Sequence, residues 1–275
     1  CSQARRRCHP PRREPTLSSA VHWLERWRNS FGNVRWRIVG ELDRIEARYR
    51  ERDASASLSG FWSLRNPVVL HLAQERERAV LRALSVGRVQ LSELKLLDIG
   101  CGLGVEFASY LRWGSRVGQL FGIDLMGDRL RIALRDSPAE VAQASGAALP
   151  FSDGAFDIVC QNVVFSSIVD DELRRATAAE MRRVLRSGGW VLWYDAARTR
   201  GRDPHFRPVP RNEVESLFPG VRWHWQRLSS DLGLLRRVAD VLGEPGMQAL
   251  DATGLFRTHL LGLGPRAHGL VPGRG

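Results

Sequence analysis

Lysine is almost absent from this sequence of 275 residues: Lys95 is the only one, and arginine supplies every other Lys/Arg position. The formal net charge is nevertheless +11, and such a basic balance would favour a nucleic-acid partner. Two observations argue against it. A preference for arginine over lysine throughout a chain is typical of a GC-rich genome, and much of the excess charge lies in the N-terminal stretch CSQARRRCHPPRREP. We therefore do not expect nucleic acid to be the partner.

Paired cysteines and long apolar runs are also missing. Cys1, Cys8, Cys101 and Cys160 lack the spacing of a zinc site or a disulfide framework, so we expect no metal. No apolar run approaches the roughly 18 residues of a membrane span, and no secretory signal is present. These absences predict a cytoplasmic protein. Because the sequence begins with Cys1 instead of methionine, we leave open whether Cys1 is the natural first residue.

The pattern of residues divides the chain into four regions. Residues 1–15 are basic, rich in proline and without apolar periodicity, which predicts a disordered tail. Residues 16–90 hold amphipathic segments such as TLSSAVHWLERWRNSF, ELDRIEARYRERD and PVVLHLAQERERAVLRAL, which predict a helical N-terminal cap. Residues 91–265 carry the main domain, and residues 266–275 are interpreted as a flexible tail. The length suits one α/β domain with additions.

Within the main domain, strand patterns alternate with helical ones over about a hundred residues, which predicts a doubly wound parallel sheet. Strands are predicted at LKLLDIG, QLFGIDL, EVAQAS, FDIVCQ and WVLWYD, and later at VRWHWQRL and RTHLLGLG. The clearest helix is DDELRRATAAEMRRVLRSGG, which acids open and arginines close, with Gly188 or Gly189 as its C-cap. A further helix, SDLGLLRRVADVLGE, lies in an insertion at about 229–256.

The stretch LLDIGCGLG, residues 96–104, places three glycines directly after a predicted buried strand. Glycines there let the chain turn and approach a ligand at the carboxyl edge of the sheet. A dinucleotide site would need a glycine where Val105 stands, and no Gly-Lys-Ser/Thr follows as in a P-loop. Asp124 ends the next strand, where an acid can accept both ribose hydroxyls. These residues indicate a nucleoside that lacks a phosphate chain.

Taken in order, these motifs resemble the class I S-adenosylmethionine-dependent methyltransferases over roughly residues 94–195. LLDIGCGLG resembles their first motif, GIDL the ribose-binding strand end, ALPFSDGAFDIV the approach to the fourth strand, and EMRRVLRSGGWVLWYD the following helix and fifth strand. The small-molecule, quinone-biosynthesis-like branch is the closest match, in a bacterial subgroup of unknown substrate. The resemblance implies S-adenosyl-L-methionine as cofactor and a Rossmann-like seven-stranded sheet, its last strand antiparallel. To this core the residue patterns add a helical N-terminal cap and a C-terminal insertion that we expect to act as a lid.

The resemblance also implies which residues bind the cofactor. The three glycines would approach its methionine half and ribose, Asp98 would orient their loop, and Asp124 would bind the ribose. Where the family usually has an acid for the adenine amino group, this chain has Ser145, whose uncharged hydroxyl should bind it more weakly. The complete predicted set is Asp98, Gly100, Gly102, Gly104, Asp124, Leu125 against one adenine face, Ser145, the Gly146 N–H and the Gln161 carbonyl.

The methyl acceptor is less well defined. The family often has His-His after the fourth strand, where this chain has Ser166-Ser167, so an obvious general base is missing. Asp195, His71 and His205 are the candidate bases, and whether a base is used at all stays open, as does the acceptor atom, which could be oxygen, nitrogen or carbon. We expect the N-terminal cap and the 229–256 insertion to cover the site. The predicted substrate-contacting residues are Tyr49, Arg52, Trp62, Phe165, Tyr194 and Asp195.

Two other functions are weighed beside a small-molecule methyltransferase. An RNA or DNA methyltransferase would suit the charge, but enzymes that methylate exocyclic base amines usually carry Asn/Asp-Pro-Pro-Tyr where this chain has Gln161-Asn162-Val163-Val164. The third possibility is a non-catalytic cofactor-binding protein. The sequence determines neither the pathway nor the oligomeric state.

Overall fold

The computed structural model describes residues 35–55, 61–199, 201 and 203–267. Seven strands form one sheet in the order β3-β2-β1-β4-β5-β7-β6. The first five are parallel, and β7 runs antiparallel to both of its neighbours, β5 and β6. The predicted α/β sheet with an antiparallel last strand is confirmed. Its strands are β1 Leu96–Ile99, β2 Leu120–Asp124, β3 Glu140–Gln143, β4 Phe156–Asn162, β5 Leu185–Ala196, β6 His224–Ser230 and β7 Arg257–Pro265.

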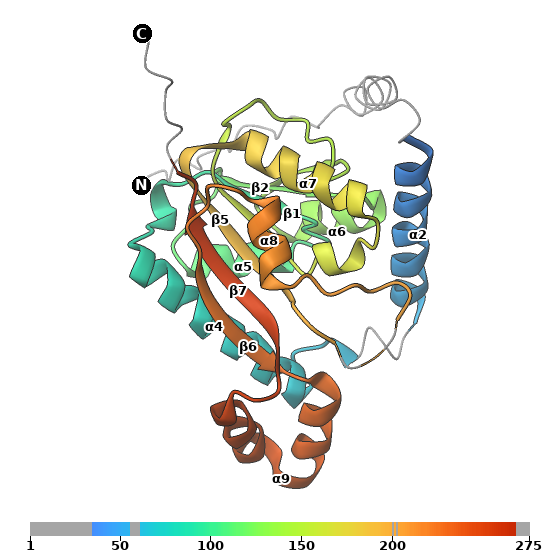
Figure 1. The fold of residues 1–275 in the computed structure, drawn as a ribbon, viewed down its shortest axis with the longest axis vertical. Coiled ribbons are helices and arrows are strands. Elements are labelled where there is room, and N and C mark those ends of the chain that lie inside the picture. Colours follow the sequence, from blue (N-terminus) through green and yellow to red (C-terminus); the bar gives the residue numbers. More distant parts are fainter. Residues whose placement is uncertain (1–34, 56–60, 200, 202, 268–275) are drawn as a thin grey trace, which may run out of the picture.

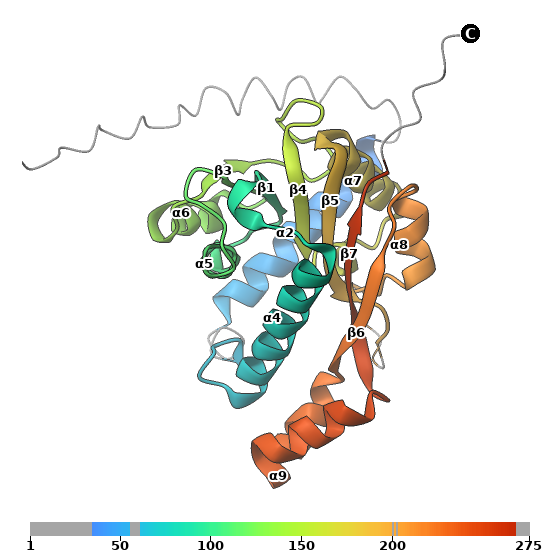
Figure 2. The ribbon, with the colours of Figure 1, turned by 90° about the vertical axis from the view of Figure 1, so that its left-hand side faces the viewer.

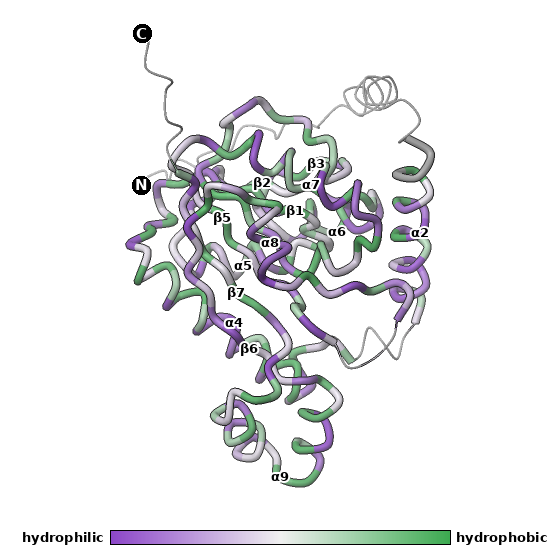
Figure 3. Tube along the Cα trace, in the orientation of Figure 1, coloured by the Kyte–Doolittle hydropathy of each residue, from purple (hydrophilic) through white to green (hydrophobic). Residues whose placement is uncertain are grey.

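Helices cover both faces of the sheet (Figures 1 and 2). One apolar cluster joins β1, β4, β5 and β7 to α4 (Pro67–Gly87), α5 (Val105–Arg112) and α6 (Gly127–Asp136). A second cluster joins the other face to α7 (Asp171–Val184) and α8 (Arg211–Leu217). Single helical turns lie at η1, Leu91–Glu93, and η2, Phe165–Ser167. Figure 3 shows that the central strands are mostly hydrophobic. Hydrophilic and hydrophobic residues alternate along the coloured part of α2 (Arg35–Ala54).

The connections show why the strands meet where they do. All five parallel strands end at one edge, which brings Ile99, Asp124, Gln143, Asn162 and Ala196 to the same end of the sheet. The β3–β4 connection is a loop, as the sequence predicts, and carries no helix. In consequence Ser145 and its neighbours lie directly at this carboxyl edge.

One helix boundary differs from the prediction. Helix α7 ends at Val184, and neither Gly188 nor Gly189 caps it. Leu185 already pairs with Phe156 of β4, so the chain passes from helix to strand without a glycine cap. Gly188 instead has a φ of 72° within an irregularity of β5. The arginines that close the pattern do lie in the last helical turn, as predicted.

Two segments added to the sheet flank it. Helix α2 packs against α7 through Leu42 and Ile45. The insertion forms α9 (Leu232–Thr253), which is kinked at Gly243, projects beyond the sheet at the end where β7 begins, and packs on α4 and β6 (Figure 1). Arg266, placed in the predicted C-terminal tail, donates to the carbonyl oxygens of Arg182 and Leu185. The predicted tail 1–15 and residues 268–275 lie outside the described residues, as does TLSSAVHWLERWRNSF.

Candidate cofactor site at the carboxyl edge

The loop between β1 and α5 has the backbone that its glycines predict. Gly100, Gly102 and Gly104 have φ angles of 71°, 54° and 77°, in the left-handed region that other residues rarely adopt. The N–H groups of Gly100 and Cys101 donate to the Ile123 carbonyl at 2.8 and 2.9 Å, which fixes the loop against β2. The loop therefore presents three positions without a side chain at the carboxyl edge.

Asp124 connects the glycine loop to the end of β2. One carboxylate oxygen accepts from the Gly102 N–H at 2.8 Å and the other from the Met126 N–H at 2.9 Å. The residue is 8% exposed, so its orientation is set by these two bonds. Each carboxylate oxygen retains a lone pair that a ribose hydroxyl could use.

Asp98, at the third position of β1, lies behind the loop in a buried polar cluster. Burial, and then the nearby Glu106 carboxylate, raise the pKa of Asp98 well above its ordinary value. One of its carboxyl oxygens is buried without a hydrogen-bond partner among the described residues. An unpaired buried oxygen is costly, and it is the kind of group that a bound cation or donor would satisfy.

The remaining predicted cofactor residues lie along the same edge. The Ser145 hydroxyl accepts from the Ala147 N–H at 3.2 Å. A side chain at Gly146 would meet Thr177 at 3.0 Å, so its glycine permits close packing there. The Leu125 carbonyl accepts from the Gln143 side chain at 2.9 Å. The Gln161 side chain donates to the Tyr194 carbonyl and accepts from Val164 N–H, which shapes the loop after β4.

Three side chains of helix α2, Tyr49, Arg52 and Asp53, gather around Arg129 of α6, which lies beside the glycine loop. The guanidinium groups of Arg52 and Arg129 lie 4.5 and 4.8 Å from the centre of the Tyr49 ring. Arg129 also pairs with Asp53 of α2 at 2.9 Å, and its Nη1 would lie 3.2 Å from a Cβ at Gly102. The structure thus brings Tyr49 and Arg52 together, and Arg129 connects them to the glycine loop. Sequence reasoning missed Arg129, although its place in the first turn after GIDL was a usable signal.

A second set of α2 contacts holds the loop that follows β4. Glu41 accepts from the Val169 N–H at 2.7 Å, and Arg44 donates to the Ser167 carbonyl at 2.6 Å. The Tyr49 hydroxyl lies 3.3 Å from the Ser167 hydroxyl. Glu41 and Arg44 were not predicted as site residues. Nothing in the one-sequence pattern distinguishes them from the other charged residues of an amphipathic helix.

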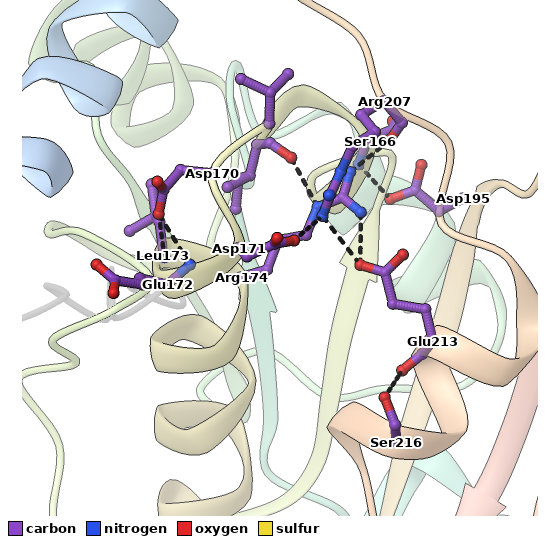
Figure 4. A network of polar contacts seen from close by, with 12 residues as sticks. Ser166, Asp170, Asp171, Glu172, Leu173, Arg174, Asp195, Arg207, Glu213 and Ser216 are labelled. Carbon is purple, nitrogen blue, oxygen red and sulfur yellow. Dashed lines mark hydrogen bonds and ion pairs between the residues drawn. The ribbon is translucent and has the colours of Figure 1, made fainter.

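Asp195 closes β5 in a fully buried position within a polar network (Figure 4). Its carboxylate accepts from the Ser166 N–H at 3.2 Å and from the Ala196 N–H at 2.8 Å. Burial raises the pKa of Asp195 to about 6. Beside it, the buried Arg174 donates to the Ile168 carbonyl and pairs with Glu213 at 2.7 Å.

The other predicted substrate residues are not gathered in one place. Phe165 has no exposed surface and packs on Trp193 with ring centres 4.7 Å apart. Tyr194 faces α4, opposite to Asp195, and its hydroxyl lies 2.7 Å from that of Ser229. Trp62 is half exposed and contacts Phe61, over which Arg236 of α9 lies. Substrate contact by these residues stays a prediction.

Two of the candidate bases are engaged in other contacts. His71 Nε2 lies 2.7 Å from Asp251, and its Nδ1 lies 3.0 Å from Glu244, both in α9. His205 Nδ1 lies 3.1 Å from an Arg44 nitrogen. His71 therefore links α4 to α9 and is not at the glycine loop.

A parallel sheet of this order, with a glycine loop after β1 and an acid after β2, defines the class I methyltransferase fold. Comparison with known proteins agrees. The family model described as "Methyltransferase domain" matches residues 97–193. The YcgJ protein of Bacillus subtilis superposes with a TM-score of 0.50 and 19% identity, covering 70% of this chain and all of that one. Residues 97–193 thus match a methyltransferase domain, and the fold agrees with the class I S-adenosylmethionine-dependent methyltransferases that the motifs resemble.

Curated relatives match over part of their length. A probable tRNA methyltransferase 9B of Mus musculus is 37% identical over 97 residues, which are 35% of this chain and 20% of that protein. The ubiquinone/menaquinone biosynthesis C-methyltransferase UbiE of Cupriavidus taiwanensis is 26% identical over 152 residues, 53% of this chain and 58% of that protein. The match therefore spans less than two-thirds of either relative. No helix among the described residues is long and apolar enough to cross a membrane.

Proposed function

We propose that the protein transfers a methyl group from S-adenosylmethionine to a small-molecule acceptor in the cytoplasm. The observation that carries this proposal is the glycine loop, whose three left-handed residues lie beside Asp124 at the end of β2. When bound there, the cofactor supplies an activated methyl group on a sulfonium. The task of the chain is then to hold donor and acceptor in line, which can supply on the order of 7–11 kcal/mol of the barrier.

The residues present fit that cofactor. The glycine loop offers backbone to the methionine half, and Asp124 offers carboxylate lone pairs to the ribose. The unpartnered oxygen of Asp98 adds a buried acceptor behind the loop, which fits the role of orienting that loop. We propose Leu125, Ser145, Gly146 and the Gln161 carbonyl for the adenine and the amino-acid end, as the motifs imply.

The acceptor side is formed by α2 and the loop after β4. We propose that Tyr49 and Arg52 face the acceptor, because Tyr49 packs on both Arg52 and Arg129, and Arg129 lies beside the glycine loop. If the acceptor loses a proton, Asp195 is the best-placed base, since its pKa of about 6 is close to neutral pH. Its carboxylate is covered by Ser166, so this role requires the loop at 164–168 to move. The relative named as a C-methyltransferase supports carbon as the first acceptor atom to test.

RNA is the second candidate acceptor. The net charge of +11 and the resemblance of 97 residues to a probable tRNA methyltransferase favour it. The absence of Asn/Asp-Pro-Pro-Tyr after β4 argues against methylation of an exocyclic base amine. The small-molecule acceptor is the better supported of the two, because it also suits the longer match to the quinone-biosynthesis enzyme.

One experiment separates these functions. The protein is incubated with methyl-labelled cofactor and an extract of the source cells, and the label is followed into an organic-solvent fraction and a nucleic-acid fraction, with and without nuclease. Label in the organic fraction that Asp124→Ala abolishes supports the proposal. Label that nuclease releases supports RNA instead. No transfer to any fraction, by a protein that binds S-adenosylhomocysteine in calorimetry, would show a non-catalytic cofactor-binding protein.

A further inference from the structure

A cavity of about 310 Å³ lies between the start of α8 and strands β6 and β7. Figure 2 shows α8 beside these two strands. Four arginines contribute to its wall, and we call the cavity, defined by Arg198, Arg211, Arg227 and Arg257, the arginine cleft. None of the residues that line it is acidic. Four guanidinium groups around one small cavity would repel one another unless an anion lay between them.

Arg198 and Arg227 have no carboxylate partner among the described residues, whereas Arg257 lies near enough to Glu75 to counter the rise that burial causes in the pKa of that carboxyl group. Arg198 donates to the carbonyl oxygens of Arg257 and Leu255. Arg257 donates to the carbonyl oxygens of Arg227 and Asp251, and its Nε is buried with no partner. The guanidinium of Arg227 forms no hydrogen bond or ion pair within the described part of the chain. Carbonyl oxygens satisfy donors but leave the positive charge in place.

Arg211 and the aromatic wall complete the cleft. Arg211 pairs with Glu215 at 2.8 Å and lies 5.9 Å from the centre of the Trp225 ring. Trp225 is half-buried, stacks on Trp223 and donates its indole N–H to Glu215 at 3.0 Å. The cleft thus joins an aromatic face to a group of guanidinium donors. This pairing suits a ligand with an anionic end and an apolar body.

Part of the cleft lies at the same end of the sheet as the cofactor site. Ala197 and Arg198 follow β5 directly, and the Ala197 N–H donates to the Thr258 carbonyl at the start of β7. The carboxyl ends of β1, β2 and β4 lie along this edge, with the glycine loop and Asp124 among them. A single ligand that runs along the edge could therefore occupy the cleft with one end and face the cofactor loop with the other.

We propose that the arginine cleft binds a phosphate or diphosphate group carried by the methyl acceptor. The inference rests on the proposed function, since it assigns the acceptor to a class of phosphorylated small molecules. Guanidinium forks match phosphate oxygens in pairs and keep their charge at any relevant pH. The cavity is at the small end of ligand pockets, which suits a compact anionic group better than a folded nucleic acid.

The proposal is tested with inorganic pyrophosphate as the probe, titrated into the full-length protein by calorimetry. S-adenosylhomocysteine is titrated separately, so that failure at the cofactor site is recognised independently. We expect pyrophosphate to bind, and Arg198→Ala/Arg227→Ala to weaken it by at least about tenfold, as loss of charged hydrogen bonds does. The affinity for S-adenosylhomocysteine should not change in that variant.

The matched control is Arg116→Ala, which removes the same charge from an exposed position before β2, at the opposite edge of the sheet. It should bind pyrophosphate as the wild type does. Equal weakening in the control, or no pyrophosphate binding by a protein that binds S-adenosylhomocysteine, overturns the proposal. So does a single-stranded RNA oligonucleotide that binds with the same dependence on Arg198 and Arg227 while pyrophosphate does not compete.

Discussion

Gly100 and Asp124 are the two residues on which the cofactor loop most depends. The first lets the chain turn with a positive φ, and the second holds the next glycine in place through its carboxylate. They therefore act at one point of the sheet from two neighbouring strands. A substitution at either residue should weaken cofactor binding, but for different physical reasons.

Asp124→Ala should weaken S-adenosylhomocysteine binding by roughly 1.5–3 kcal/mol, the effect of losing charged hydrogen bonds. Because the variant also releases the Gly102 and Met126 N–H groups, its fold is checked by circular dichroism and thermal melting. Calorimetry of the folded variant gives the affinity. Wild-type affinity there would mean that the ribose is not bound at β2.

Gly100→Ala should destabilise the protein by two separable effects. Its φ of 71° costs an alanine about 1–2 kcal/mol, and the new Cβ would lie 2.6 Å from a Val164 methyl. Denaturant unfolding of Gly100→Ala, Val164→Ala and the double variant separates them, since shortening Val164 relieves only the contact. If the double variant were as stable as Val164→Ala, the backbone contribution would be absent.

At the scale of elements, His71 joins helix α4 to α9. Burial alone would lower the pKa of His71, but hydrogen bonds to Glu244 and Asp251 outweigh it and raise the pKa. A histidine whose pKa is higher in the folded than in the unfolded protein stabilises the fold. This stabilisation is complete below the pKa of the unfolded state, near 6.5, and is lost as the pH rises through the pKa of the folded state. Glu75 and Arg257 also face this group.

The stability difference between wild type and His71→Phe should therefore be largest in mildly acidic solution and shrink at alkaline pH. Urea unfolding at a series of pH values measures it. Glu244→Gln serves as a control that removes one of the two charges and should reduce the slope without abolishing it. A difference that grows with rising pH would contradict the assigned direction.

Helix α9 is the second element whose role can be tested. Leu235 and Met247 are fully buried beside Val68 of α4, so the helix is anchored to α4 and not to the glycine loop. Replacing residues 232–253 by a short loop should abolish turnover and spare cofactor affinity, if α9 covers the acceptor. Leu235→Ala is the control for stability alone. An enzyme that kept its rate and substrate preference after the replacement would exclude a covering role.

Element boundaries show where the sequence was informative. Apolar runs identified β1, β2, β4, β5 and β7, because strands that helices cover on both faces of a sheet read as continuous hydrophobic segments. The end of α7 was missed, since Leu185 is drawn into β5 by pairing with Phe156, which no local pattern reveals. The helix predicted to end at Glu244 continues to Thr253 after a kink at Gly243, where φ is 60°.

For the whole molecule, the cofactor edge could be predicted because its residues follow strand ends in sequence order. The arginine cleft could not, because its four arginines come from separate connections and strands that only the folded sheet brings together. In a chain where nearly every basic residue is arginine, the residue type carries no signal. What distinguishes the cleft is that no acidic residue lines it, which is a property of the tertiary structure.

The basic N-terminal stretch should contribute little to the stability of the fold. Residues 1–15 hold five arginines and three prolines among the charge-rich stretch CSQARRRCHPPRREP, without apolar periodicity, so they have little to pack. Their removal should leave cofactor affinity unchanged and shift the melting temperature by no more than a few degrees, as measured by calorimetry and thermal unfolding.

The matched control is a truncation that removes residues 1–54 and with them α2. That change deletes the Glu41 contact with the Val169 N–H and the Arg44 contact with the Ser167 carbonyl, so the loop after β4 loses its support. It also leaves Arg129 without Asp53 beside the glycine loop. Stability and cofactor affinity should both fall in this variant. A large drop in melting temperature from the short truncation would instead show that the basic segment packs on the domain.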